Sequence, residues 1–250
     1  MRPVLLEVRG LTKRFGGLTA VKSVGFTVSA GEVLGILGPN GAGKTTLYNL
    51  LTGFIRPDEG SVEFRGRSLL GLAPHRIVRL GVARTFQLCR PFVGMTVLEN
   101  VLVGGLANAA ARTGAGAREA RARDLVAQVG LAGKEHTAVE VLSYGDQRRL
   151  EIARALATGP SLLLLDEPFA GLGAHEIADL SALIRRIHAD EGLTVLLIEH
   201  RLHEFMKLVD RVIALDFGET IADDVPERIV RNPRVIEAYI GGSADTAGTV

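Results

Sequence analysis

The stretch that decides the fold covers residues 38–46 and reads Gly38-Pro39-Asn40-Gly41-Ala42-Gly43-Lys44-Thr45-Thr46. It fits the phosphate-loop pattern, in which a glycine and four free positions precede Gly-Lys-Ser/Thr. Glycines let the backbone curl so that several N–H groups point at one oxyanion. The Lys44 ammonium suits the β- and γ-phosphates of a nucleotide, and the Thr45 hydroxyl suits a bound Mg²⁺. The stretch therefore predicts a nucleotide-binding site.

The segments on either side of this loop supply the context that the pattern requires. Residues 32–37 form a short apolar run that predicts a buried strand, and residues 45–51 have helical spacing. The loop then ends at a helix N-terminus, where N–H groups and the helix dipole favour an anion. The alternative is a glycine-rich turn that matches by chance, and the flanking strand and helix disfavour it.

The composition limits the class of protein. The 250 residues suit one or two domains, and a hydrophobic content of 47% allows a large core. Lys and Arg (29) balance Asp and Glu (28), so no overall positive field argues for a nucleic-acid partner. The single Cys89 excludes an internal disulfide and fits a reducing compartment. No apolar stretch approaches the ~18 residues of a spanning helix, and the N-terminus lacks a signal-peptide pattern, so we expect a soluble protein.

Strand patterns surround the phosphate loop. Residues 4–9, 21–28 and 61–65 read as strands and predict an antiparallel sheet beside the nucleotide site. Phe15 lies between the first two strands. An exposed aromatic ring there could stack on adenine, whereas a buried one would belong to the core, and the sequence leaves both open.

The middle of the protein, residues 96–157, is mainly helical in pattern. Thr96 begins one helix with Glu99 three positions later, which is a capping box. Residues 107–122 are rich in Ala, Gly and Arg and predict a mobile loop that leads into a helix. Further on, Leu142-Ser143-Tyr144-Gly145-Asp146 precedes a helix expected over 147–157. A serine and a glycine at a helix start form a second anion-binding arrangement, although an ordinary helix cap explains them more simply.

Two carboxylates follow a strongly apolar strand. Residues 162–165 are four consecutive leucines, which predicts a strand buried on both faces. Asp166 and Glu167 come at its carboxyl end, where open α/β sheets bind ligands. Asp166 can hold Mg²⁺ through water and Glu167 can polarise an attacking water, whereas the alternative is a pair of ordinary loop carboxylates.

The last part of the sequence alternates helices and strands: a helix over 175–189, strands over 194–198 and 212–215, and a helical pattern over 226–240. His200 follows the strand at 194–198, and a lone histidine in such a place is usually structural. The small, polar residues 242–250 predict a disordered tail.

Taken together, these motifs resemble those of the nucleotide-binding subunit of ABC transporters, over about residues 4–241. The resemblance rests on the Walker A loop at 38–46, Gln87 as the Q-loop, the signature at 142–146, Walker B at 162–166 with Glu167, and His200 as the switch histidine. It implies an α/β fold with a RecA-like P-loop core, an antiparallel β subdomain and an inserted helical subdomain. The implied boundaries are 4–88 with 158–241 for the core and β subdomain, and 89–157 for the helical subdomain.

The resemblance also assigns functional residues. The implied ATP-binding residues are Phe15, Val21, Gly38, Pro39, Asn40, Gly41, Ala42, Gly43, Lys44, Thr45, Thr46 and Gln87. The implied catalytic residues are Glu167, His200 and Lys44, and the implied Mg²⁺ ligands are Thr45, Gln87 and Asp166. The signature residues Ser143, Tyr144, Gly145 and Asp146 would reach the ATP that is bound by a partner subunit.

Finer motifs resemble the importer branch that takes up branched-chain amino acids. They are residues 15–18 (Phe-Gly-Gly-Leu), 84–87 (Arg-Thr-Phe-Gln), 96–100 (Thr-Val-Leu-Glu-Asn), 142–145 (Leu-Ser-Tyr-Gly) and 235–241 (Val-Ile-Glu-Ala-Tyr-Ile-Gly). This branch implies transmembrane permease subunits, a second ABC ATPase subunit that is identical or different, and an indirect periplasmic or extracellular substrate-binding protein. It implies a peripheral position on the cytoplasmic face of the cell membrane. Urea and amide importers share much of this pattern.

Two residues depart from the family pattern. Asp146 stands where the signature usually has Gln, and Gly173 stands where the loop after Walker B usually has Asp or, in this branch, Asn. Asp146 adds negative charge near phosphate, and Gly173 removes a polar group from the expected contact between subunits. Either change could slow hydrolysis or weaken the coupling between sites.

Three other functions compete with import. A soluble ABC ATPase acting on nucleic acid or ribosomes would predict two ATPase halves or a long coiled-coil insertion, and the sequence has neither. A regulatory module that binds ATP without hydrolysing it is distinguished by ATP turnover. A lipid or lipopolysaccharide exporter subunit is a closer alternative.

Overall fold

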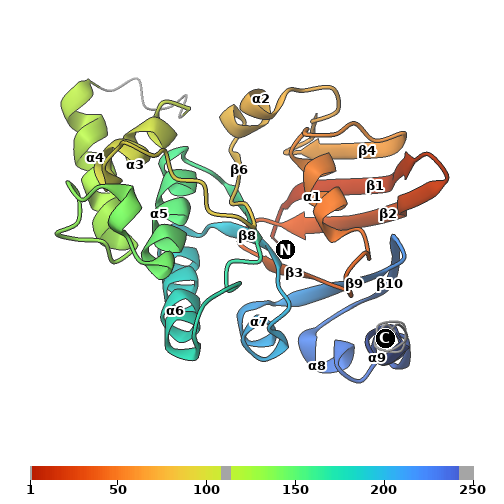
Figure 1. Cartoon of the computed structure of the whole chain (residues 1–250). Helices are drawn as coiled ribbons and strands as arrows, with labels where there is room; N and C mark the ends of the chain where they lie inside the picture. Colours follow the sequence, from red (N-terminus) through yellow and green to blue (C-terminus); the bar gives the residue numbers. More distant parts are fainter. Residues whose placement is uncertain (1, 108–113, 242–250) are drawn as a thin grey trace. The chain divides into compact units, whose positions relative to one another are not determined.

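The computed structural model of the protein describes residues 2–107 and 114–241 (Figure 1). The predicted tail at 242–250 and part of the predicted mobile loop lie outside these residues. The protein divides into two compact units, each described by itself below. The first unit comprises Met1–Ala73 and Thr194–Val250, and the second unit comprises Pro74–Leu193.

The first unit contains the predicted antiparallel sheet. Its strands are β1 (Val4–Phe15), β2 (Leu18–Ser29), β4 (Glu59–Phe64) and β5 (Arg67–Ser68), in the order β2-β1-β4-β5. The three predicted strands are confirmed, and β1 and β2 are longer than predicted because they pair along their whole length up to the turn at Gly16. Gly16 has φ 57, a conformation that glycine adopts without steric cost.

The second sheet of the first unit carries the phosphate loop. Strand β3 (Val33–Leu37) lies parallel to β8 (Thr194–Ile198) on one side and to β9 (Arg211–Asp216) on the other, and β10 (Glu219–Asp224) runs antiparallel to β9. Every residue of β3 and β8 is buried, as expected for strands covered on both faces. Helix α1 (Lys44–Leu51) follows β3, and its Tyr48 hydroxyl donates a hydrogen bond to Leu196 O at 2.7 Å.

The C-terminal segment of the first unit contains three short helices: α7 (Leu202–Leu208), α8 (Pro226–Ile229) and α9 (Pro233–Gly241). The single helix predicted over 226–240 is wrong, because the backbone leaves the helical path at residues 230–232. Pro233 offers no N–H and disfavours helical geometry at the residue before it. The Asn232 side chain accepts a hydrogen bond from Arg234 N at 3.0 Å, and a separate helix, α9, begins at Pro233.

The second unit is mainly helical. Its elements are α2 (Pro74–Arg79), β6 (Val82–Arg84), α3 (Val97–Gly105), α4 (Ala115–Gln128), a 3₁₀ turn (Val139–Val141), α5 (Tyr144–Ala157), β7 (Leu162–Asp166) and α6 (Ala174–Glu191). Helices α3, α4 and α5 pack together (Figure 1). The predicted capping box of α3 is confirmed, since Thr96 N donates to Glu99 Oε2 at 2.7 Å and Glu99 N donates to Thr96 Oγ1 at 3.3 Å. Strands β6 and β7 are parallel, and all five residues of β7 are buried.

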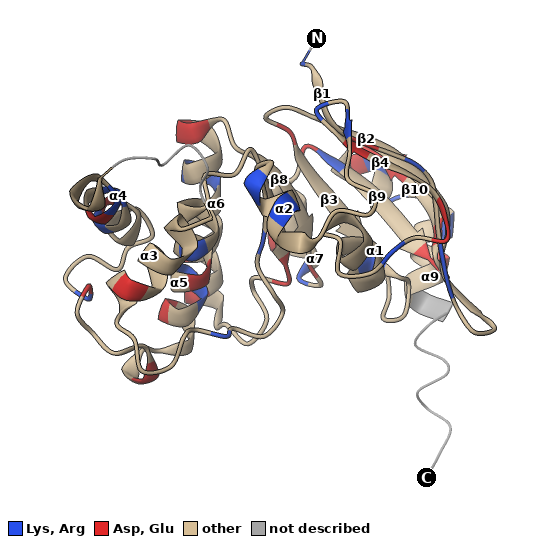
Figure 2. Ribbon diagram, turned by 90° about the horizontal axis from the view of Figure 1, so that it is seen from above, with Lys and Arg blue, Asp and Glu red and all other residues tan. Residues whose placement is uncertain are grey.

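Positively and negatively charged residues are interspersed along the elements of each unit (Figure 2). This mixture agrees with the near-zero net charge of the protein. Among the described residues, no helix has both the length and the apolar character that crossing a membrane requires.

Candidate functional site

The phosphate loop of the first unit is shaped by glycines that allow close approach. Gly43 has φ 96, and a Cβ atom there would lie 2.2 Å from Ala20 O. A Cβ atom on Gly38 would lie 2.4 Å from Leu215 O. Both distances are far shorter than van der Waals contact, so no other residue fits unless the backbone shifts. The path of the loop is therefore fixed by β2 and β9 on its flanks.

Lys44 places its ammonium group inside this loop. The side chain is only 6% exposed, and Nζ donates hydrogen bonds to Gly38 O at 2.7 Å and Pro39 O at 2.8 Å. Helix α1 begins at Lys44 with Gly43 at its N-cap, so its first turn relies on no capping side chain. A positive helix terminus and a buried ammonium thus occur at one place, which is an anion-binding arrangement. Thr45, in the same turn, is exposed.

The two residues predicted to contact adenine differ in exposure. Phe15 ends β1 and is 48% exposed, so the alternative that it fills the core is wrong. Lys13 Nζ lies 5.5 Å from the centroid of the Phe15 ring. Val21 is completely buried, so a base could touch it only after the surrounding side chains move. Phe15 is therefore the better candidate for stacking.

Replacing Phe15 by alanine is expected to weaken ATP binding by about 1 kcal/mol, the usual value of an aromatic pair. Because the ring is half exposed, its removal should leave the thermal midpoint nearly unchanged. Phe15→Tyr serves as the control and should bind as the wild type does. Affinity measured by nucleotide titration decides, and a variant that loses stability but keeps its affinity would contradict stacking.

The C-terminal segment holds the phosphate loop from the side. Tyr239 on α9 accepts a hydrogen bond from Gly38 N at 3.1 Å, and Gly218 N donates to Ala42 O at 3.2 Å. Burial raises the pKa of Tyr239 above its ordinary value. Tyr239 belongs to one of the importer-branch motifs, but its contact with the loop is not predicted. A hydrogen bond between residues 201 positions apart leaves no local signal in the sequence.

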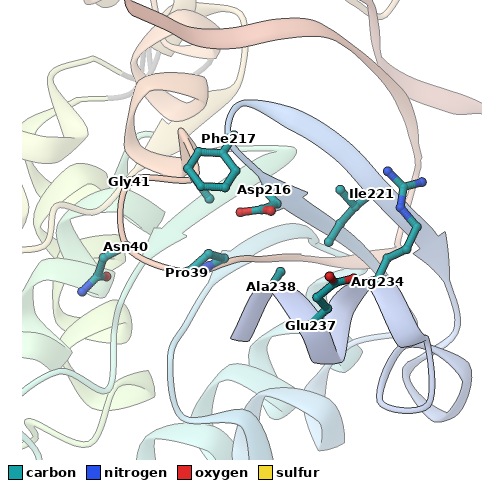
Figure 3. Close-up of a pocket in the computed structure, with 10 residues that line it drawn as sticks. Pro39, Asn40, Gly41, Asp216, Phe217, Ile221, Arg234, Glu237 and Ala238 are labelled. Atoms are coloured by element: carbon teal, nitrogen blue, oxygen red, sulfur yellow. The ribbon is translucent and has the colours of Figure 1, made fainter. Parts of the chain in front are cut away.

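A pocket of about 570 Å³ lies between the loop and this segment (Figure 3). Figure 3 shows Pro39 and Gly41 facing Asp216, the last residue of β9, and Phe217, which lies in the turn between β9 and β10. Phe217 is 84% exposed and has φ 42, which is uncommon for a bulky residue. The remaining lining residues are Asn40, Ala42, Ile221, Arg234, Glu237 and Ala238.

His200 follows β8 in the first unit and is exposed, as an interaction with a ligand would require. Its backbone is held by the preceding residue: Glu199 Oε2 accepts hydrogen bonds from His200 N at 2.9 Å and Arg201 N at 3.2 Å. Glu199 itself is 2% exposed. No motif in the sequence singles out this glutamate, which fixes the turn that presents the histidine.

The predicted carboxylates lie at the end of β7 in the second unit. Asp166 Oδ2 forms a salt bridge with Arg84 Nη2 at 2.6 Å, and both side chains are buried. Arg84 belongs to an importer-branch motif, but this partner is not predicted. Glu167 has φ 49, and strained backbone in a non-glycine residue is frequent at functional sites. Gln87 Nε2 donates to Glu167 Oε2 at 3.0 Å, so the structure brings these two predicted residues together.

The predicted Mg²⁺ ligands have suitable chemistry. Thr45 in the first unit offers a hydroxyl oxygen, and Gln87 and Asp166 in the second unit offer amide and carboxylate oxygens, which are the donors that Mg²⁺ prefers. The residues therefore fit the ion. Asp166 already pairs with Arg84, which favours a water-mediated role for this carboxylate. Within residues 2–107 and 114–241, no cluster of three or more His, Cys, Asp or Glu residues could hold a metal alone.

The signature segment starts helix α5 earlier than predicted. The helix begins at Tyr144 instead of residue 147, because the Ser143 hydroxyl caps it by accepting a hydrogen bond from Asp146 N at 3.1 Å. A Cβ atom on Gly145 would lie 2.7 Å from Glu176 Oε1. A hollow of about 160 Å³ lies here, lined by Ser143, Gly145, Asp146, Arg149, Leu172, Glu176 and Leu180.

The two departures from the family pattern have local partners in the second unit. Asp146 forms an ion pair with Lys134, which offsets the negative charge that the substitution adds. Gly173 is the N-cap residue of α6, and its N–H donates to Glu176 Oε2 at 2.9 Å. Both residues therefore have an ion-pair or hydrogen-bond partner within the second unit.

A loop whose path requires glycines, followed by a buried lysine at the start of α1, defines a phosphate-loop nucleotide-binding protein. Comparison with known proteins gives the family. The family model described as ABC transporter matches residues 21–170, and the model described as branched-chain amino acid ATP-binding cassette transporter matches residues 219–245. The chain belongs to the ABC transporter family.

Individual relatives agree with this result. The protein is 44% identical to the high-affinity branched-chain amino acid transport ATP-binding protein BraF of Pseudomonas aeruginosa, covering 96% of this sequence and 98% of that protein. It is 43% identical to LivG of Escherichia coli, which has the same description, with 96% and 99% coverage. A crystal structure of the ADP conformation of an ABC transporter cassette superposes with a TM-score of 0.87 at 31% identity, covering 95% of this protein and 99% of that one. The predicted fold class is confirmed.

Proposed function

We propose that this protein is the ATP-binding subunit of an ABC importer, and that it hydrolyses MgATP to drive the uptake of branched-chain amino acids. Two relatives at 43–44% identity carry that description across nearly their whole length. The observation that carries the substrate class is the separate match of residues 219–245 to the family model for branched-chain amino acid transporters. Urea or amide import and lipid or lipopolysaccharide export are the alternatives.

The first unit binds the nucleotide in this proposal. The N–H groups of the phosphate loop and the Lys44 ammonium stabilise the charge that develops on the γ-phosphoryl group. The buried position of Lys44 supports this role, since an ammonium with little water around it interacts more strongly with phosphate. Phe15 stacks on adenine, and His200 contacts the γ-phosphate.

The second unit supplies the hydrolytic groups. Glu167 orients or deprotonates the attacking water, and Gln87 holds the Glu167 carboxylate through the 3.0 Å hydrogen bond. Gln87 and Asp166 of this unit, with Thr45 of the first unit, would hold Mg²⁺, which would supply positive charge to stabilise the phosphates. Ser143, Tyr144, Gly145 and Asp146 reach the nucleotide of a second ATPase subunit.

The proposed partners follow from the family. A dimeric post-hydrolysis structure of an ATP-binding cassette bound to ADP and phosphate supports a pair of ATPase subunits. That cassette is 25% identical to this protein, with a TM-score of 0.80, covering 89% of this protein and 99% of that one. Permease subunits hold the protein at the cytoplasmic face of the membrane, and a substrate-binding protein acts indirectly. The exposed apolar side chains Leu88 (64%), Phe92 (41%) and Val93 (75%) in the second unit support a docking surface for a permease.

The domain boundaries remain part of the proposal: 4–88 with 158–241 for the core and β subdomain, and 89–157 for the helical subdomain. In this division Phe92, Val93 and the signature belong to the helical subdomain, and Leu88 lies at its boundary.

Reconstitution tests the proposed function directly. The purified protein, assembled with the membrane subunits that co-purify with it, should hydrolyse ATP and drive ATP-dependent uptake of leucine, isoleucine or valine into proteoliposomes. Urea or an aliphatic amide offered to the same vesicles checks the nearer alternative. An assembly that binds ATP without turnover would identify the regulatory module instead.

A further inference from the structure

The buried guanidinium of Arg148 joins helix α5 to the loop that carries Gln87. Arg148 is 2% exposed. Its Nη2 atom donates to Gln87 O at 2.7 Å, and its Nη1 atom donates to Phe86 O at 3.1 Å. Burying a guanidinium is unfavourable unless its N–H groups are hydrogen-bonded, so these contacts constrain both segments.

Glu151, one turn further along α5, also holds this loop. Its Oε1 atom accepts a hydrogen bond from Phe86 N at 2.7 Å. Helix α5 thus contacts both backbone polar groups of Phe86 and the carbonyl of Gln87. A shift of this loop relative to α5 would break several charge-assisted hydrogen bonds at once.

Tyr144 connects this arrangement to the signature and to the loop after Glu167. Its hydroxyl accepts a hydrogen bond from Arg148 Nη2 at 2.7 Å, and the guanidinium lies 5.1 Å from the ring centroid. The ring lies against Gly171, where a Cβ atom would approach Tyr144 Cε1 to 2.8 Å. Gly171 belongs to the connection between β7 and α6, four residues after Glu167. One signature residue therefore contacts both the arginine that holds the Gln87 backbone and the loop that follows Glu167.

We propose that Tyr144 and Arg148 are positioning residues that fix the Gln87–Glu167 hydrogen bond and link it to the signature. Engagement of Ser143 and Gly145 by a partner's nucleotide would then be transmitted through Tyr144 to the carboxylate that activates water in the same subunit. We call Tyr144, Arg148, Gln87 and Glu167 the relay. All four residues lie in the second unit. The inference rests on the proposed function, and it identifies how the signature acts on hydrolysis.

Tyr144→Phe tests the relay by removing one oxygen while keeping the ring on Gly171. Losing a hydrogen bond to a charged group changes an equilibrium or rate constant that depends on it by about tenfold. We expect kcat for ATP hydrolysis to fall about tenfold, with KM for ATP changed less than about twofold because the phosphate loop is untouched. In the nucleotide-free protein, amide hydrogen exchange at residues 85–88 should become about tenfold faster.

Arg148→Lys keeps the positive charge but cannot bridge two carbonyls and a hydroxyl, so its kcat should fall further. Arg186→Lys is the matched control, because Arg186 lies on α6 of the same unit and also donates to a backbone carbonyl, that of Gln128, at 2.5 Å. This control should keep wild-type kcat and wild-type exchange at residues 85–88.

The exchange measurement separates this inference from the proposed function. If the wild-type protein does not hydrolyse ATP, the function is wrong, yet faster exchange at residues 85–88 in Tyr144→Phe still supports the relay. Wild-type exchange and kcat in Tyr144→Phe would overturn it, even if Arg148→Lys fails to fold. A raised KM with unchanged kcat would also overturn it, because Tyr144 would then serve binding alone.

Discussion

Replacing Lys44 by alanine should weaken MgATP binding at least about 100-fold, because two or more charge-assisted hydrogen bonds to phosphate are lost at once. The ammonium lies 6% exposed at the start of α1, where Nζ is held by the carbonyl oxygens of Gly38 and Pro39. A phosphate that enters the loop meets this charge with little intervening water, which strengthens the interaction. Isothermal titration with MgATP measures the effect.

Two controls separate lost charge from lost structure in this experiment. Lys44→Met keeps most of the buried volume and should bind ATP as poorly as Lys44→Ala does, with a smaller loss of thermal stability. Lys22→Ala removes an exposed lysine of the same unit, paired with Glu219, and should bind like the wild type. Wild-type affinity in Lys44→Ala would contradict the assignment of the loop.

The parts of the fold that the sequence predicts correctly are those with strong local patterns. The strands β7 and β8 are continuous apolar runs, and each is buried throughout, as predicted. The capping box of α3 needs only the spacing of two residues, and it is confirmed. The phosphate loop is recognisable because its glycines and lysine must occur at fixed positions.

The errors arise where one residue overrides a regional pattern. Residues 226–240 have helical periodicity, but Pro233 divides the segment into α8 and α9. Helix α5 starts at Tyr144 because the Ser143 hydroxyl caps its first turn.

The partners of the site residues could not be predicted from the sequence. Arg84 pairs with Asp166 across 82 positions, and Tyr239 bonds to Gly38 across 201 positions. Arginines and tyrosines are common on protein surfaces, so nothing local marks these as buried or paired. The sequence predicts which residues carry the chemistry, whereas the fold shows which residues contact them.

Replacing Glu167 by glutamine should lower kcat for ATP hydrolysis by about 10²–10⁴-fold, the usual contribution of a general base. Glutamine keeps the size of the side chain, and its amide oxygen can still accept the hydrogen bond that Gln87 Nε2 donates at 3.0 Å to Glu167 Oε2. The geometry of the site is thus retained while the carboxylate that activates water is lost. Affinity for MgATP should stay within about threefold, because the phosphate loop is unaltered.

Retained binding together with lost turnover distinguishes a loss of water activation from a loss of nucleotide affinity. Release of phosphate measures turnover, and titration with MgATP measures binding on the same sample. Glu119→Gln on α4, an exposed glutamate paired with Arg123, is the matched control and should hydrolyse ATP at the wild-type rate. Because Glu167 has φ 49, its backbone is strained whichever of the two residues occupies the position, so the comparison isolates the carboxylate. Glu167→Gln with wild-type turnover would mean that another group activates the water, and the water-activating role proposed for Glu167 would be withdrawn.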